Sequence, residues 1–188
     1  MILPVAMGLR YDKRDKSVFS YNGRKDTEER SIMLKAIPKH WFSWDFRVMD
    51  GTRQVADMDL SFWRRKELLS IEGTPYKVFR EGLVSGAYIL ETGGAVAARA
   101  EKPNALRRSF LIEHEGRQLT LQARSVVGRA FALYDGQNEI GSVTPDWFFT
   151  RRATALLPEA LPLPLRIFIL WLVIILWRRE ADSGSKGE

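Results

Sequence analysis

The chain has no cysteine and only two histidines among its 188 residues. Without cysteine it forms no disulfide, no thiolate metal site and no cysteine nucleophile, and this absence fits a reducing compartment. The histidines, His40 and His114, have no partner at the spacing of a metal-binding motif. We therefore expect the protein to bind neither a metal ion nor a cofactor.

Recognisable catalytic motifs are also missing from the sequence. Gly93-Gly94 lacks the Gly-Lys-Ser/Thr ending of a phosphate-binding loop, and there is no Gly-x-Ser-x-Gly elbow and no EF-hand spacing. Asp57 and Asp59 lie on one face of a strand-like segment, where they either act on a cation or proton or simply form a solvated face. No catalytic constellation is visible, so we expect a non-enzymatic protein. An enzyme with an unrecognised site is one alternative.

Basic residues outnumber acidic residues by 29 to 23, which gives a net charge of +6 and a pI of about 9.7. This balance either favours anionic partners, such as lipid headgroups, nucleic acid or acidic proteins, or only maintains solubility. Residues 1–10 have no basic start, and Pro4 and Gly8 interrupt their apolar residues, which does not fit a signal peptide. We expect a cytoplasmic protein, with peripheral attachment to a membrane as an option.

Small turn pairs ending in glycine recur along the chain. Such pairs supply the positive φ angles that tight hairpin turns require, and their spacing is nearly even from Gly51 onward. The pairs are Asn22-Gly23, Asp50-Gly51, Glu72-Gly73, Gly93-Gly94, Glu115-Gly116 and Asp135-Gly136. Each pair predicts one hairpin, so the series predicts an antiparallel meander of about twelve strands.

The segments beside these turns alternate apolar and polar residues, as half-buried strands do. Residues 42–49 alternate before the turn at Gly51, and residues 118–124 alternate after the turn at Gly116. Gly141 interrupts the alternation that follows Gly136, which predicts a β-bulge.

The longest apolar run, residues 167–177, lies near the C-terminus between Arg166 and Arg178-Arg179. As a helix, residues 165–177 would reach roughly 20 Å, short of the ~30 Å hydrocarbon core of a bilayer. Prolines at 158, 162 and 164 prevent a clean upstream extension. A tail-anchored membrane protein with this segment in the bilayer is the alternative to a helix buried in the protein.

A helix that is apolar on every face needs a surrounding coat, and a barrel of about twelve strands needs its interior filled. The sequence therefore predicts a mainly β domain: an antiparallel barrel of consecutive hairpins that encloses a C-terminal hydrophobic helix. We expect an N-terminal arm at residues 1–15, the barrel domain at 16–179 with its helix at about 165–178, and a flexible tail at 180–188.

This pattern resembles the tubby C-terminal-like superfamily, which comprises tubby domains, phospholipid scramblases and LURP-one-related proteins. The hairpin series 42–144, the strand-like segment 131–136 and the closing segment 161–177 carry the resemblance, which covers about residues 15–180. Because tubby domains bind phosphoinositides, the resemblance implies binding to an anionic phospholipid or phosphoinositide, or to a protein partner. Only Glu159 precedes the helix, in place of the acidic calcium-binding stretch of scramblases, so calcium-driven scrambling is not expected.

Aromatic residues stand beside basic residues at 62–66, 147–152 and 177–179. Such neighbours suit an anionic membrane surface or nucleic acid, or they are core aromatics beside arginines that reach solvent. The resemblance favours the membrane surface and makes nucleic acid the less expected partner. The candidate headgroup-binding residues, chosen because they cluster, are Arg64, Arg65, Lys66, Arg107, Arg108, Arg151 and Arg152.

Overall fold

The computed structural model describes residues 30–41, 43–60, 66–82, 86–103, 108–147 and 150–184. They form twelve β-strands followed by one α-helix, α1, at Leu163–Gly184. The strands are β1 (Ser31–Pro38), β2 (Phe46–Asp50), β3 (Arg53–Asp59), β4 (Lys66–Ile71), β5 (Thr74–Arg80), β6 (Tyr88–Thr92), β7 (Ala95–Glu101), β8 (Ser109–His114), β9 (Arg117–Ala123), β10 (Phe131–Asp135), β11 (Asn138–Pro145) and β12 (Ala153–Pro158).

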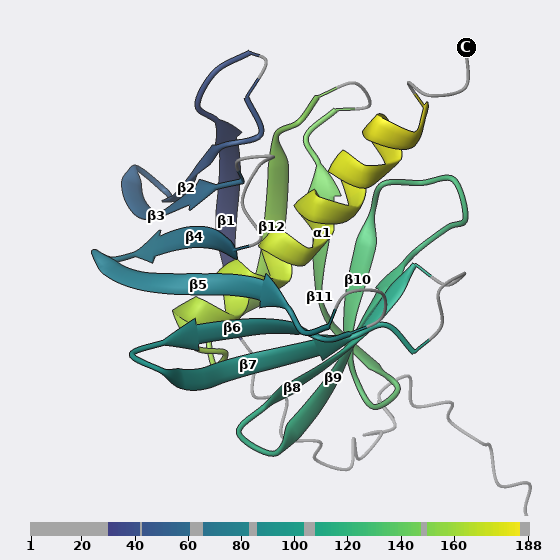
Figure 1. Cartoon of the computed structure of the whole chain (residues 1–188). Coiled ribbons are helices and arrows are strands. Elements are labelled where there is room, and N and C mark those ends of the chain that lie inside the picture. Colours follow the sequence, from purple (N-terminus) through teal and green to yellow (C-terminus); the bar gives the residue numbers. More distant parts are fainter. Residues whose placement is uncertain are drawn as a thin grey trace, which may run out of the picture.

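The strands form a closed barrel in which every strand pairs antiparallel with its neighbours in the sequence, and β1 pairs with β12 to close it. Figure 1 shows α1 running through the middle of this barrel. The mainly β fold predicted from the turn pairs and the apolar run is therefore confirmed. The described residues contain no helix that is both long enough and apolar enough to cross a membrane.

The two ends of the barrel differ because tight turns and longer connections alternate along the meander. The tight turns join β2 to β3, β4 to β5, β6 to β7, β8 to β9 and β10 to β11, and we call their end the turn rim. The longer connections start at the C-terminal ends of the odd-numbered strands, and we call that end the loop rim. The helix begins at the turn rim and ends at the loop rim (Figure 1).

Five of the six predicted turn pairs lie at the turn rim. Both residues of Glu72-Gly73, Gly93-Gly94 and Glu115-Gly116 have positive φ, as a type I′ hairpin turn requires. Gly51 and Gly136 also have positive φ. The sixth pair, Asn22-Gly23, and the predicted N-terminal arm lie outside the described residues.

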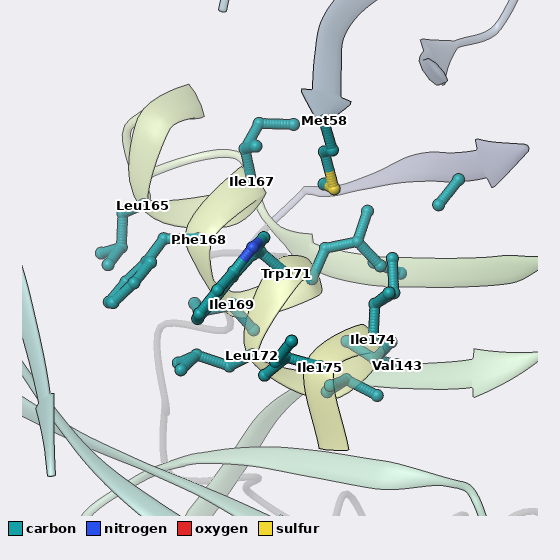
Figure 2. Packing of buried hydrophobic residues seen from close by; sticks show 14 of the residues in the cluster. Met58, Val143, Leu165, Ile167, Phe168, Ile169, Trp171, Leu172, Ile174 and Ile175 are labelled. Carbon is teal, nitrogen blue, oxygen red and sulfur yellow. The ribbon is translucent and has the colours of Figure 1, made fainter. Parts of the chain in front are cut away.

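The helix is buried on every side. All its side chains from Leu165 to Arg178 are buried, and Figure 2 shows Met58 of β3 pointing towards it from the barrel wall. The helix comes closest to β7 and β12, each of which has two small inward residues. These residues are Ala98, Ala100, Ala153 and Ala155. The alanines leave room for the backbone of α1.

The helix is longer than the sequence predicted, since it continues past residue 178 to Gly184. Two contacts support the extra turn. Glu180 forms an ion pair with Arg108 at 2.8 Å, and the Ser183 hydroxyl donates a hydrogen bond to the carbonyl of Arg179 at 2.7 Å. The tail predicted at 180–188 is thus helical as far as Gly184, and residues 185–188 lie outside the described part of the chain.

The segment that alternates before Gly51 becomes a strand only from Phe46. The residues before it form a turn, in which the Ser43 hydroxyl accepts the Asp45 N–H at 2.8 Å and the Lys39 N–H bonds the Asp45 carbonyl at 2.8 Å. The Asp45 carboxylate also accepts the N–H of Leu60 at 3.0 Å, which ties this connection to the end of β3. Side-chain hydrogen bonds of this kind compete with strand pairing.

The bulge predicted at Gly141 is present, because Leu133 pairs with Gly141 while Tyr134 pairs with Glu139. A Cβ at position 141 would lie 2.7 Å from the carbonyl oxygen of Leu156. We expect Gly141→Ala to destabilise the barrel by about 1–3 kcal/mol through this backbone clash. That loss lowers the melting temperature by about 2–4 °C per kcal/mol in a domain of this size.

The matched control for this prediction is Gly136→Asn. Gly136 has a φ of 59°, and no other atom lies within 4 Å of the place that a Cβ would take there. Asparagine tolerates the left-handed region. Thermal melting followed by circular dichroism compares the two variants. Equal melting temperatures for Gly141→Ala and the wild type would contradict the close approach of β11 and β12.

Candidate functional site

Cations stack on aromatic rings around the loop rim. Six such pairs among the described residues lie at this end, where α1 leaves the barrel. The distances from the cation to the ring centroid are 5.9 Å for Arg80 and Tyr88, 5.6 Å for Lys102 and Phe110, 5.3 Å for Arg108 and Phe131, 4.2 Å for Arg129 and Trp177, 5.0 Å for Arg151 and Trp44, and 5.4 Å for Arg179 and Tyr88. The rings are near strand ends, in α1 or, for Trp44, in the connection before β2, so they hold the cations close to the rim.

Some of these rim residues serve the structure. Trp177 is buried and donates a hydrogen bond from Nε1 to the carbonyl of Arg129 at 3.0 Å, and Arg178 is buried and donates one to the carbonyl of Leu60. At 177–179 the sequence pattern therefore includes a core tryptophan and a buried arginine that bond α1 to the barrel.

Other rim cations have no carboxylate partner. Among the described residues, Lys102, Arg151, Arg152 and Arg179 form no ion pair, whereas Arg108 pairs with Glu180. Exposed ion pairs contribute little to stability, but an unpaired cation remains available to an external anion. The loop rim thus has positive charge that the protein itself does not neutralise.

Lys102 shows how closely the cations gather. The pKa of Lys102 is lowered, first by burial of its ammonium and then by the nearby charges of Arg179 and Arg80, whereas Glu180 raises it. Positive neighbours disfavour the charged lysine, and an anion placed among them would favour it. This part of the rim is therefore electrostatically poised for an anionic group.

A pocket of about 640 Å³ opens between the connection after β1 and the connection before β12. Its described lining includes Trp41 and Trp147, which are 84% and 70% exposed, together with the cations Arg151 and Arg152. Arg151 is fixed by a hydrogen bond from Nη1 to the carbonyl of Ser43 at 3.2 Å. Exposed tryptophans beside arginines match the chemistry of a membrane interface, where one side of the ring is wet and the other apolar.

The turn rim has the opposite character. Four of its turns have a carboxylate beside the glycine, and Arg53 and Arg117, which lie among them, are ion-paired with Glu72 and Asp135. Arg166 is buried close to this end, where burial lowers the pKa of its guanidinium and the charge of Asp50 raises it. The loop rim therefore has several cations without ion-pair partners, and the tight turns at the other end have carboxylates beside four of their glycines.

The structure separates the predicted headgroup-binding residues. Arg151 and Arg152 lie at the loop rim without ion-pair partners, while Arg108 is there too but is engaged by Glu180. Arg64, Arg65 and Arg107 lie outside the described residues, and Lys66 is described only in its backbone, as the first residue of β4.

Sequence reasoning missed Trp41, Arg80 and Lys102, and it noted Arg179 only within the aromatic–basic segment 177–179. Their position between the turn pairs could have identified them. In a meander of hairpins, a residue midway between two tight turns lies at the end of the barrel opposite those turns. All of these residues except Arg179 lie between turn pairs, and Arg179 follows from the helix direction.

Two of the residues considered for other chemistry, Asp57 and His114, have structural partners. The Asp57 carboxylate pairs with Lys39 at 2.8 Å and accepts a hydrogen bond from Gln54 at 2.6 Å. His114 bonds the carbonyl of Ala97 through Nδ1 at 2.7 Å. Within the part of the chain that the structure describes, no group of three or more histidine, aspartate or glutamate residues is arranged to hold a metal ion.

The two ends of the barrel therefore differ in charge, in exposed aromatic surface and in the length of their connections. Comparison of the chain with family models, with curated proteins and with solved structures gives no match in any of the three.

Proposed function

We propose that the chain is a non-catalytic tubby-like domain whose loop rim binds anionic phospholipid headgroups at a membrane surface. The observation that carries this proposal is the set of four cations without carboxylate partners, Lys102, Arg151, Arg152 and Arg179, at the rim that also exposes Trp41 and Trp147. The closed barrel around a buried apolar helix supports the tubby-like assignment, since that architecture is what the resemblance implies.

Electrostatic magnitudes limit what the cations achieve by themselves. A lysine or arginine near an anionic leaflet contributes about 1 kcal/mol. Four such cations contribute about 4 kcal/mol, which corresponds to a dissociation constant of about 1 mM. Charge alone therefore gives weak, salt-sensitive attachment, and apolar contact with the bilayer must strengthen it.

Vesicle flotation tests the proposal. We expect the full chain to float with vesicles of phosphatidylcholine mixed with phosphatidylserine at low salt, and to leave them as salt rises and screens the cations. Vesicles of phosphatidylcholine alone should leave the protein at the bottom of the gradient. Equal recovery with the two vesicle types would contradict the proposal.

Two further arms of the same assay separate the ligand classes. Vesicles that contain a phosphoinositide, matched in total charge to the phosphatidylserine vesicles, show whether the rim prefers a phosphorylated headgroup. A labelled single-stranded oligonucleotide in the same buffer tests the nucleic-acid alternative, and tighter binding to it than to either anionic vesicle would count against a lipid surface.

A further inference from the structure

The most exposed apolar side chains of the described residues gather on one part of the loop rim. Val126 and Val127 are 90% and 95% exposed, in the connection between β9 and β10. Trp41 and Trp147, the exposed tryptophans of the pocket, lie in the connections between β1 and β2 and between β11 and β12. Because β12 pairs with β1 and with β11, these three connections are neighbours around the barrel.

The connection that presents the two valines has a defined shape. The Ser125 hydroxyl accepts the N–H of Gly128 at 2.7 Å, and the N–H of Arg124 bonds the carbonyl of Ala130 at 2.9 Å. Arg108 donates from Nη1 to the carbonyls of Val126 and Gly128. These hydrogen bonds, which involve the backbone and the side chains of Ser125 and Arg108, hold the connection in shape, and both valines at its tip are exposed.

Charge indicates what covers these apolar side chains. Arg151 and Arg152 line the pocket of Trp41 and Trp147 without an ion-pair partner, and the acidic turns lie at the far end of the barrel. A partner that complements these cations and apolar side chains has a layer of negative charge above an apolar interior. An anionic bilayer has that order, with its phosphates outside the acyl chains.

We propose that Trp41, Val126, Val127 and Trp147 enter the boundary between headgroups and acyl chains of an anionic bilayer, so that the loop rim faces the membrane and the turn rim faces away. This inference rests on the proposed function and adds to it a depth and an orientation. The rim cations then lie at the level of the lipid phosphates.

Site-specific labelling tests the insertion cleanly because the chain has no cysteine of its own. Val127→Cys and Val96→Cys are labelled with an environment-sensitive fluorophore in the full chain. Val96 is the matched control, since it is also a valine, is 63% exposed and lies beside the tight turn between β6 and β7 at the opposite rim. Flotation of the same labelled samples with phosphatidylcholine–phosphatidylserine vesicles measures binding independently.

We expect the label at position 127 to shift to shorter wavelength and brighten several-fold on the vesicles, and the label at position 96 to stay unchanged. Flotation without a change at position 127 would overturn the insertion and leave headgroup binding intact. Absence of flotation would overturn both. A change at position 96 equal to that at 127 would overturn the orientation, and a change at 127 without vesicles that grows with protein concentration would assign the surface to a second copy of the chain.

A second variant measures the contribution of the two valines without a label. Val126→Thr with Val127→Thr keeps side-chain shape while replacing one methyl group in each by a hydroxyl. We expect the vesicle dissociation constant to rise by roughly tenfold, because two buried methyl groups are lost from the apolar layer. An unchanged constant would place the valines outside the bilayer.

Discussion

Replacement of Ile169 by aspartate is expected to unfold the barrel. Ile169 is completely buried, in the part of α1 that the strands surround. Loss of the aliphatic side chain from the core costs about 2–5 kcal/mol. An uncompensated buried carboxylate adds a penalty of several kcal/mol. Together these losses are comparable with the whole free energy of unfolding of a typical domain, about 5–15 kcal/mol.

Two controls make this result interpretable. Ile169→Val removes one methyl group at the same position and should cost only about 1 kcal/mol. Val96→Asp introduces the same carboxylate on an exposed strand position and should leave the melting temperature nearly unchanged. Circular dichroism and urea denaturation of the three variants measure the difference. A cooperative Ile169→Asp protein with wild-type melting would contradict the placement of α1 inside the barrel.

Local chemistry made much of the fold predictable. Gly73, Gly94 and Gly116 identify tight turns because only glycine adopts their φ values without strain. The apolar run 167–177 identifies the core helix because no face of it is suited to water. Both features depend only on residues that are close together in the sequence. The turns and the core helix can therefore be predicted without knowing which residues pack against them.

Features that depend on tertiary contacts were not predictable. The helix continues to Gly184, and Glu180 in this extension pairs with Arg108, which is far away in the sequence. The first strand begins at Ser31, with no glycine pair to mark it, because it pairs with β12 to close the barrel. A hydrophobic pattern gives no information on either contact.

The candidate site was only partly predictable for the same reason. Arg151 and Arg152 stand out in the sequence because they adjoin aromatic residues. Lys102 does not, and it becomes part of the site only because α1 leaves the barrel beside it and brings Arg179 near. Which cations are already paired also depends on the fold, as Arg108 shows.

Reversing the charge of Arg151 and Arg152 is expected to abolish measurable binding to anionic vesicles. Each substitution by glutamate changes the local charge by two units, which costs about 2 kcal/mol at the surface of an anionic leaflet. The double variant loses about 4 kcal/mol, close to a 1000-fold rise in the dissociation constant. Titration of the full chain with phosphatidylcholine–phosphatidylserine vesicles measures this change.

The control for the double variant is Lys35→Glu with Lys77→Glu. These lysines are exposed on β1 and β5 and lie along the strands, away from the loop rim. Both double variants lower the net charge equally, so a difference between them reports the position of the charge rather than its total. Equal weakening by the two would attribute binding to net charge alone.

Stability must be separated from binding in this experiment, because Arg151 also bonds the carbonyl of Ser43 and stacks on Trp44. Arg152→Glu alone leaves both contacts in place, since Arg152 is exposed and takes part in neither. It should melt like the wild type and still weaken vesicle binding by about 30-fold, the equivalent of about 2 kcal/mol. Normal melting would show that the fold of this variant is intact, so that the charge at position 152 is what differs from the wild type. Unchanged vesicle binding by such a variant would then show that the loop rim does not face the lipid.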